Sequence, residues 1–232
     1  MSTVDASEVA KFGHLAARWW EPNGPMRPLH RMNPLRVGWI DQRITARLAA
    51  PVRLLDLGCG AGIAAEAFAR RGHTVLGVDA STDAIGAAEA HAEGEGLSLT
   101  YRVGAAEDLA AEGQTFDVVT ALEVIEHVED QAEFMRLLAT LTAPGGLVFV
   151  STLNRTLRSL AVAKIGAEYI ARLLPVGTHD WRRFVAPDAL AGFGRAAGLR
   201  LIDITGMEMA ALSGNWRASR EMGINYLAAF QR

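Results

Sequence analysis

The chain has 232 residues, half of them apolar, with a net charge of −3 and a single cysteine, Cys59. This length is typical of one domain with a substantial core, no apolar run approaches the roughly 18 residues of a membrane span, and the first residues lack the regions of a secretory signal. The lone cysteine excludes an internal disulfide and predicts a cytoplasmic protein, while the absence of a long basic tract argues against a nucleic-acid substrate.

Residues 1–50 are predicted to form a helical N-terminal cap. Ser7 is expected to cap a helix that runs toward Trp19 and Trp20. Three prolines then predict a loop: Pro22, Pro25 and Pro28. A second helix is expected to begin with Pro34 at its first position, where a missing N–H is tolerated.

From residue 51 onward, apolar segments alternate with helical patterns. Strands are predicted at 53–57, 74–78, 98–103, 116–121 and 146–151. Such alternation is typical of a doubly wound, mostly parallel sheet with an α/β fold. Two later segments, 200–207 and 224–230, are expected to complete a seven-stranded sheet in antiparallel orientation. Residues 51–232 are therefore predicted to form one domain.

A glycine-rich turn follows the first predicted strand, with the pattern D-x-G-x-G-x-G from Asp56 to Gly62. Gly58 and Gly60 let a ligand approach the backbone without meeting a Cβ. Asp79 ends the next strand at an offset from which an acid accepts hydrogen bonds from ribose hydroxyls. These residues predict a nucleoside-binding site.

The same glycines also fit the dinucleotide fingerprint, which leaves an NAD-dependent oxidoreductase as an alternative. Asp56 argues against it, because a carboxylate just before the turn would repel a pyrophosphate. A ligand that carries an ammonium and a sulfonium would be attracted instead. The turn resembles the first motif of class I methyltransferases, which take their methyl group from S-adenosylmethionine.

The fourth predicted strand leads into Leu122, Glu123, Glu126 and His127. Ligands lie beyond the carboxyl ends of parallel strands, so Leu122 is expected to line the cofactor pocket. If a helix begins at Glu123, the two glutamates and His127 share one face. They are then predicted to bind Mg²⁺ or, as the plainer alternative, to satisfy the start of the helix.

Methyl transfer to a phenolic oxygen requires that its proton be removed, because a free phenol has a pKa of about 10. The acidic cluster, which consists of Glu123, Glu126 and His127, is expected to orient or deprotonate the hydroxyl. A chelated metal or a general base, His127 or His179, would each suffice. The sequence leaves this choice open.

Residues 156–183 interrupt the alternation of strands and helices. Apolar residues recur there at helical spacing, with Arg158, Lys164 and Arg172 among them. The pattern predicts a basic amphipathic segment that contacts an anionic membrane surface, or a lid helix packed on the active site. Both interpretations hold if the lid admits a lipid-like substrate.

Several segments resemble the ubiquinone biosynthesis O-methyltransferases. They are RWWEPNGPMRPLHRMNPLR (18–36), EVIEHV (123–128), STLNR (151–155) and GAEYIARLLPVGTHDW (166–181). The similarity extends over nearly the whole chain. It implies methylation of ring hydroxyls on polyprenylated phenol and quinol intermediates, namely a 2-polyprenyl-6-hydroxyphenol and a 3-demethylubiquinol.

The resemblance also implies roles for individual residues. Arg36 is expected to hold the carboxylate of the donor in bidentate fashion. The resemblance implies that the donor is bound by Arg36, Gly58, Asp79 and Leu122. The family usually has a methionine at the position of Leu122. It further implies a metal at Glu123, Glu126 and His127, and peripheral attachment to the inner membrane through 156–183.

Two other functions stay open at this point. One is a methyltransferase for another small aromatic or lipid acceptor. The other is a non-catalytic, lipid-binding role among other ubiquinone-biosynthesis proteins.

Overall fold

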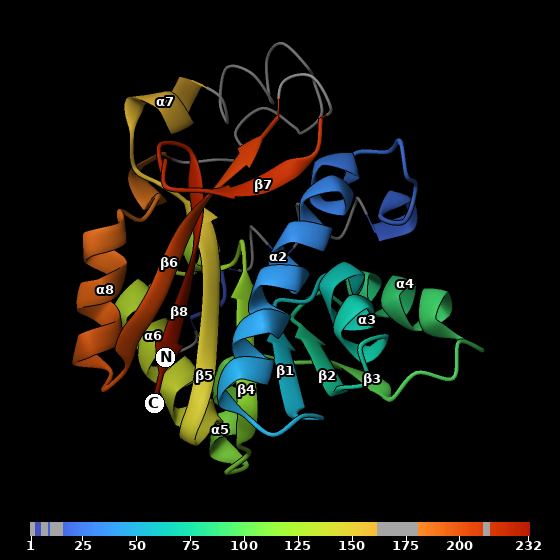
Figure 1. The fold of residues 1–232 in the computed structure, drawn as a ribbon. Coiled ribbons are helices and arrows are strands. Elements are labelled where there is room, and N and C mark those ends of the chain that lie inside the picture. Colours follow the sequence, from blue (N-terminus) through green and yellow to red (C-terminus); the bar gives the residue numbers. More distant parts are fainter. Residues whose placement is uncertain (1–2, 6–8, 10–15, 162–180, 211–213) are drawn as a thin grey trace.

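The fold is that of a computed structural model, which describes residues 3–5, 9, 16–161, 181–210 and 214–232. A central sheet has the strand order β3-β2-β1-β4-β5-β8-β6-β7 (Figure 1). The strands are β1 (Arg53–Leu57), β2 (Thr74–Asp79), β3 (Leu99–Val103), β4 (Phe116–Leu122), β5 (Thr142–Leu153), β6 (Arg200–Met209), β7 (Trp216–Ser219) and β8 (Asn225–Gln231).

Helices connect and cover these strands. The α-helices are α2 (Arg27–Arg47), α3 (Ile63–Ala69), α4 (Thr82–Ala92), α5 (Ala106–Ala111), α6 (Gln131–Leu141), α7 (Leu157–Leu160) and α8 (Pro187–Ala196). The described residues also include the short 3₁₀ helices η1 (Ala16–Arg18), η2 (Ile125–His127) and η4 (Trp181–Arg183). Among the described helices, none combines the length and the apolar character needed to cross a membrane.

The predicted fold class is confirmed. Strands β1 to β5 pair in parallel, whereas β8 runs antiparallel to both β5 and β6, as predicted for the two late segments. An eighth strand, β7, pairs with the edge of β6. Strand β7 was not predicted, because it has only four residues and only two of them, Trp216 and Ala218, are apolar.

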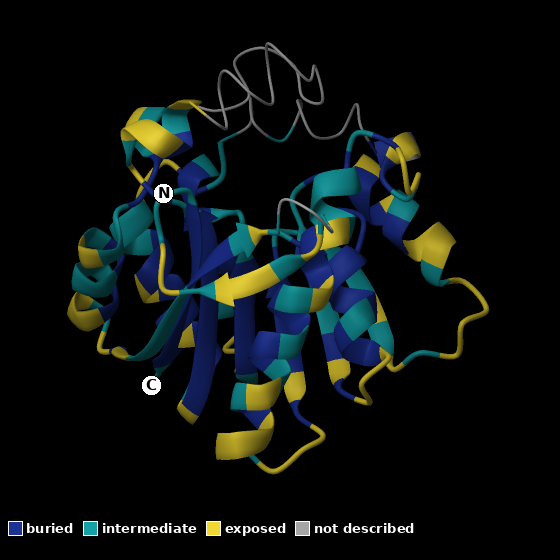
Figure 2. Ribbon diagram, turned by 45° about the horizontal axis from the view of Figure 1, so that its top comes forward, coloured by how far each residue is buried: buried dark blue, intermediate teal, exposed yellow. Residues whose placement is uncertain are grey.

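The core lies on both faces of the sheet. Neighbouring residues of a strand point to opposite faces, so Leu54 packs against the layer of α2 and α3. Leu55 packs on the other side, with α5, α6 and α8. Figure 2 shows the central strands buried between these layers. The long apolar runs of the strands follow from burial on both faces.

The start of α2 differs from the prediction. The helix begins at Arg27, with Pro28 in its first turn, and Pro34 lies inside it rather than at its first position. Pro28 suits the first turn because its missing N–H has no partner there. Pro34 costs one hydrogen bond, which the burial of Val37, Ile40 and Ile44 on the sheet offsets.

Other predictions fall partly outside the described residues. The helix expected from Ser7 is described only at residue 9 and at η1, and most of segment 156–183 is not described. His179, Lys164 and Arg172 also lie outside. The described ends of this segment are α7 and η4, which the Trp181 indole joins by donating a hydrogen bond to the Thr156 carbonyl at 3.0 Å.

Candidate functional site

A cavity of about 300 Å³ lies at the carboxyl ends of β1, β2 and β4. This is the edge where open α/β sheets bind ligands, and the volume suits a small molecule. All predicted site residues that the structure describes line it: Arg36, Asp56, Gly58, Gly60, Asp79, Leu122, Glu123, Glu126 and His127.

The glycine turn after β1 forms one wall of the cavity. Gly60 has a φ of +54°, in the left-handed region that favours glycine. A Cβ added there would lie 2.5 Å from Cζ2 of Trp19, a side chain that lines the same cavity. Gly60 is therefore required by the packing of Trp19 as well as by the turn.

Asp79 is held as a fixed acceptor at the end of β2. The backbone N–H of Gly60 donates to its Oδ2 at 2.8 Å, and that of Ser81 donates to Oδ1 at 2.9 Å. Burial raises the pKa of Asp79, and these backbone donors offset only part of that rise. Each carboxylate oxygen keeps a further lone pair, with which it can accept from a ribose hydroxyl.

Two buried side chains of opposite charge, Asp56 and Arg36, line the cavity. Thr120 donates to Oδ1 of Asp56 at 2.7 Å, while Oδ2 has no hydrogen-bond partner in the described structure. Burial raises the pKa of Asp56 to about 6. Nε of Arg36 is equally buried and unpartnered there. An unpartnered carboxylate oxygen and an unpartnered guanidinium Nε in one cavity fit the ammonium and the carboxylate of an amino acid.

Glu123 does not begin a helix, contrary to the prediction. It directly follows β4 with a φ of +60°, which is uncommon for a residue other than glycine. Ser151 on β5 accounts for this conformation. Its carbonyl accepts from the Glu123 N–H at 3.0 Å, and its hydroxyl donates to Glu123 Oε1 at 2.7 Å.

The predicted metal site does not follow from this arrangement. The shared helical face of Glu123, Glu126 and His127 is absent, because only the 3₁₀ helix η2 follows β4. Across the part of the chain that the structure describes, no three His, Cys, Asp or Glu side chains are grouped so that they could hold a metal ion. The Glu123 carboxylate is instead engaged by Ser151, and Arg36 lies 4.0 Å from it.

Glu126 is a second acid that lines the cavity, and it is buried. Its side chain is 3% exposed, and the Thr152 hydroxyl donates to its Oε2 at 2.8 Å. Burial and, after it, the charge of Glu123 raise the pKa of Glu126 to about 7, whereas His127 opposes the shift. A carboxyl group that titrates near neutrality in a cavity is suited to general base catalysis.

Part of the cavity wall was not predicted from the sequence. Five further residues line the cavity: Trp19, Met26, Leu29, Ile63 and Phe134. The paired tryptophans of the RWW sequence were the available signal. Apolar lining residues are otherwise indistinguishable in sequence from ordinary core residues.

Comparison with known proteins gives concordant results. A family model described as "Methyltransferase domain" matches residues 30–204. The chain is 48% identical over 233 residues to a ubiquinone biosynthesis O-methyltransferase of Burkholderia cenocepacia, covering 100% of this chain and 99% of the relative. It is 47% identical over 241 residues to that of Cereibacter sphaeroides, covering 100% and 98%.

Solved structures show the same fold. Magnesium protoporphyrin IX methyltransferase from Synechocystis PCC 6803 with bound SAM has a TM-score of 0.65 at 17% identity, over 100% of both chains. A SAM-dependent methyltransferase from Thermotoga maritima, a possible histamine N-methyltransferase, has a TM-score of 0.67 at 17% identity, over 96% of this chain and 98% of that one.

Proposed function

Because this chain belongs to the ubiquinone biosynthesis O-methyltransferase family, we propose that it methylates ring hydroxyls of polyprenylated phenol and quinol intermediates in ubiquinone biosynthesis. The acceptors are a 2-polyprenyl-6-hydroxyphenol and a 3-demethylubiquinol. The observation that carries the proposal is the full-length identity, together with one cavity lined by both Asp79 and the buried Glu126. Membership of a methyltransferase family also removes the NAD-dependent alternative.

The donor side of the cavity is built from three charged groups. Asp79 accepts from the ribose hydroxyls, since its two oxygens are fixed by Gly60 and Ser81. Arg36 binds the donor's carboxylate, and Oδ2 of Asp56 accepts from its ammonium. Leu122 contributes an apolar wall. S-adenosylmethionine, bound in this way, supplies a methyl group that its sulfonium already activates.

The acceptor side has to remove a proton and exclude water. In one step, the acceptor oxygen forms a bond to the methyl carbon while the bond between this carbon and sulfur breaks. The electron pair of the broken bond stays on sulfur. Glu126, ionised near neutral pH, takes the proton that the hydroxyl loses. His127 lines the same cavity, and its charge lowers the pKa of Glu126.

The decisive experiment is an assay of labelled methyl transfer. A short-chain demethylubiquinol is expected to accept label with a kcat/KM at least about tenfold above that of an unrelated catechol, because the proposal requires selection by the site. Equal transfer to both would favour a methyltransferase for other small acceptors. Binding of lipid vesicles without any transfer would favour the non-catalytic role.

The sequence of Glu123, Glu126 and His127 predicts a dependence of activity on Mg²⁺. On that prediction, excess chelator slows turnover and added Mg²⁺ restores it. Initial rates with and without EDTA, at saturating donor and acceptor, measure the effect. Full activity in chelator would contradict the metal role and leave proton removal to the side chains.

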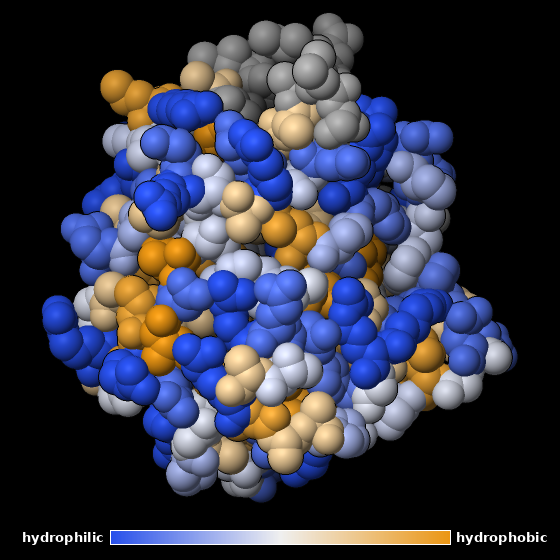
Figure 3. All heavy atoms as spheres, viewed as in Figure 1, coloured by the Kyte–Doolittle hydropathy of each residue, from blue (hydrophilic) through white to orange (hydrophobic). Residues whose placement is uncertain are grey.

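We also propose that residues 156–183 dock the enzyme on an anionic membrane surface, where its prenylated substrate lies. The described part offers one supporting observation: Leu157 is 78% exposed, between the exposed Arg155 and Arg158. Figure 3 shows apolar surface next to strongly hydrophilic residues in the region of α7, at the upper left. Basic residues around exposed apolar ones are typical of interfacial segments.

Charge reversal tests this docking. Lys164→Glu with Arg172→Glu is expected to reduce binding to vesicles containing anionic lipid by about 30-fold or more, at roughly 1 kcal/mol for each of the two basic residues. Activity on a short-chain, water-soluble acceptor should be retained. The control is Arg47→Glu with Arg136→Glu, two arginines outside the segment. Equal vesicle binding by both double variants would leave 156–183 without a membrane role.

A further inference from the structure

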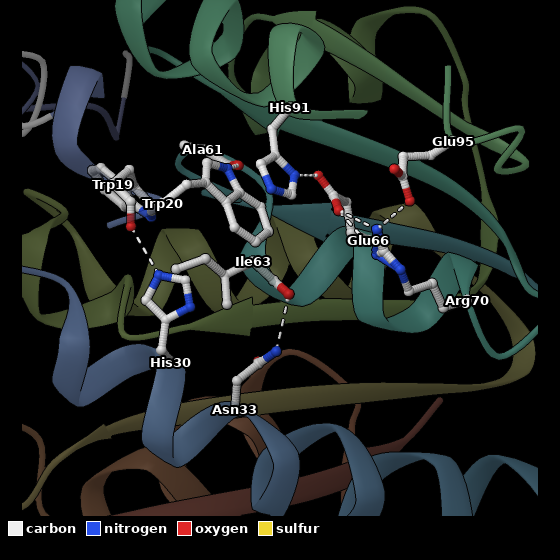
Figure 4. A network of polar contacts seen from close by, with 10 residues as sticks. All are labelled: Trp19, Trp20, His30, Asn33, Ala61, Ile63, Glu66, Arg70, His91 and Glu95. Carbon is white, nitrogen blue, oxygen red and sulfur yellow. Dashed lines mark hydrogen bonds and ion pairs between the residues drawn. The ribbon is translucent and has the colours of Figure 1, made fainter. Parts of the chain in front are cut away.

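Trp20 joins three separate parts of the chain. Its indole N–H donates to the carbonyl of Ala61, in the glycine turn, at 2.8 Å. Its ring stacks on the imidazole of His91 in α4, with centroids 3.4 Å apart and planes inclined by 2°. Figure 4 shows the indole lying between these two partners. The segment before α2 is thereby tied to the turn and to α4.

His91 is itself held in place. Its Nδ1 lies 2.7 Å from Oε1 of Glu66, a carboxylate of α3 whose side chain is only 1% exposed. Glu66 also pairs with Arg70 at 3.1 Å, so the buried charge has two partners (Figure 4). The contact with Glu66 therefore fixes the orientation of the imidazole on which Trp20 stacks.

The residue that these contacts position is Trp19. Its indole packs against Gly60 so closely that a Cβ there would lie 2.5 Å away, and it lines the cavity. Nε2 of His30 lies 2.9 Å from the Trp19 carbonyl, which adds a third anchor for the pair. Because Trp19 and Trp20 are adjacent, the contacts of Trp20 determine where Trp19 lies.

We propose that Trp20 and His91 are positioning residues of the donor site. They hold Trp19 over Gly60 and so complete the wall against which the donor binds, although neither of them lines the cavity. This inference rests on the proposed function, in which the cavity binds an S-adenosyl compound. Loss of the stacked ring or of the hydrogen bond to the turn carbonyl is expected to release Trp19 from Gly60, and thereby to lower donor affinity.

The test is calorimetric titration with S-adenosylhomocysteine, combined with initial rates. His91→Ala is expected to weaken binding about threefold to tenfold, and Trp20→Ala about tenfold or more. The KM for S-adenosylmethionine should rise by the same factors, whereas kcat at saturating donor should stay within about twofold. His91→Phe keeps an aromatic ring against Trp20 and should recover most of the affinity lost in His91→Ala.

Two matched controls accompany these variants. Glu89→Ala removes an exposed side chain from the same helix, α4, and Trp216→Phe changes a tryptophan on β7. Both should bind S-adenosylhomocysteine like the wild type. His91 is partly exposed, so its variants are expected to fold even if Trp20→Ala does not.

The outcomes separate the positioning role from the proposed function. If wild type and all variants bind S-adenosylhomocysteine equally, and the variants differ only in melting temperature, the pair is structural and the positioning role is overturned. A fall in kcat instead of a rise in donor KM would overturn it as well. If the wild type itself does not bind, the proposed function fails first, and the inference with it.

Discussion

Replacing Asp79 with alanine is expected to weaken the binding of S-adenosylhomocysteine by at least about 100-fold. Hydrogen bonds to a charged group contribute about 1.5–3 kcal/mol each, and the proposed site uses two of them for the ribose. Asp79 also accepts from the backbone of Gly60 and Ser81, so its loss releases the turn that shapes the cavity. Calorimetric titration of each variant gives the dissociation constant.

Two variants make this result specific. Asp79→Asn keeps the size of the side chain and one carbonyl oxygen, so we expect a smaller loss of affinity than in Asp79→Ala. Asp83→Ala removes an exposed carboxylate from the first turn of α4 and is expected to leave binding unchanged. An unaltered dissociation constant in Asp79→Ala would refute its assignment to the ribose, provided that the variant melts as a folded protein.

Glu126→Gln is expected to lower kcat by about 10²–10⁴-fold, the usual contribution of a general base. Glutamine preserves the volume and can still accept from the Thr152 hydroxyl, which lies 2.8 Å from Oε2. The dissociation constant for S-adenosylhomocysteine should remain near that of the wild type, because Glu126 serves the acceptor. Rates at saturating donor and acceptor measure the loss.

The pH dependence provides an independent check on Glu126. A base must be ionised to accept a proton, and burial raises the pKa of Glu126 to about 7. Above that value the wild-type kcat should be independent of pH, and below it kcat should fall about tenfold per pH unit. This fall of kcat on the acidic side, the acidic limb of the pH profile, should vanish in Glu126→Gln.

The control is Glu129→Gln, which neutralises an exposed acid beyond η2 and should keep both kcat and the limb. Persistence of the limb in Glu126→Gln would assign it to another group. Of the bases that the sequence left open, His127 lines the cavity and is the next to be replaced.

The strands were predictable because they are buried on both faces. Long apolar runs bounded by turn residues place β1 and β2 to within one residue of their observed ends. Gly58, Gly60 and Asp79 were predictable for a similar reason, since a turn with positive φ and an acid at the next strand end depend on local sequence. Their meeting in one cavity follows from the parallel order of the strands.

The acidic cluster was predictable in composition but not in geometry. Its spacing suggested a helical face, yet Glu123 adopts a positive φ because Ser151 of β5 binds both its N–H and its carboxylate. That partner is remote in sequence, and no local pattern indicates it. The start of α2 could not be predicted for the same reason. Its burial against the sheet outweighs the helix-breaking effect of the proline inside it.

What the sequence by itself determined is the order of strands and helices, the glycine turn with its acids, and the family resemblance, because each depends on residues close together along the chain. Only the tertiary structure decided which acid is buried beside Thr152, how Ser151 orients Glu123, and that Trp20 stacks on His91. These features depend on packing between distant segments. Desolvation and contact distance, which set charge and orientation, exist only once the segments have come together.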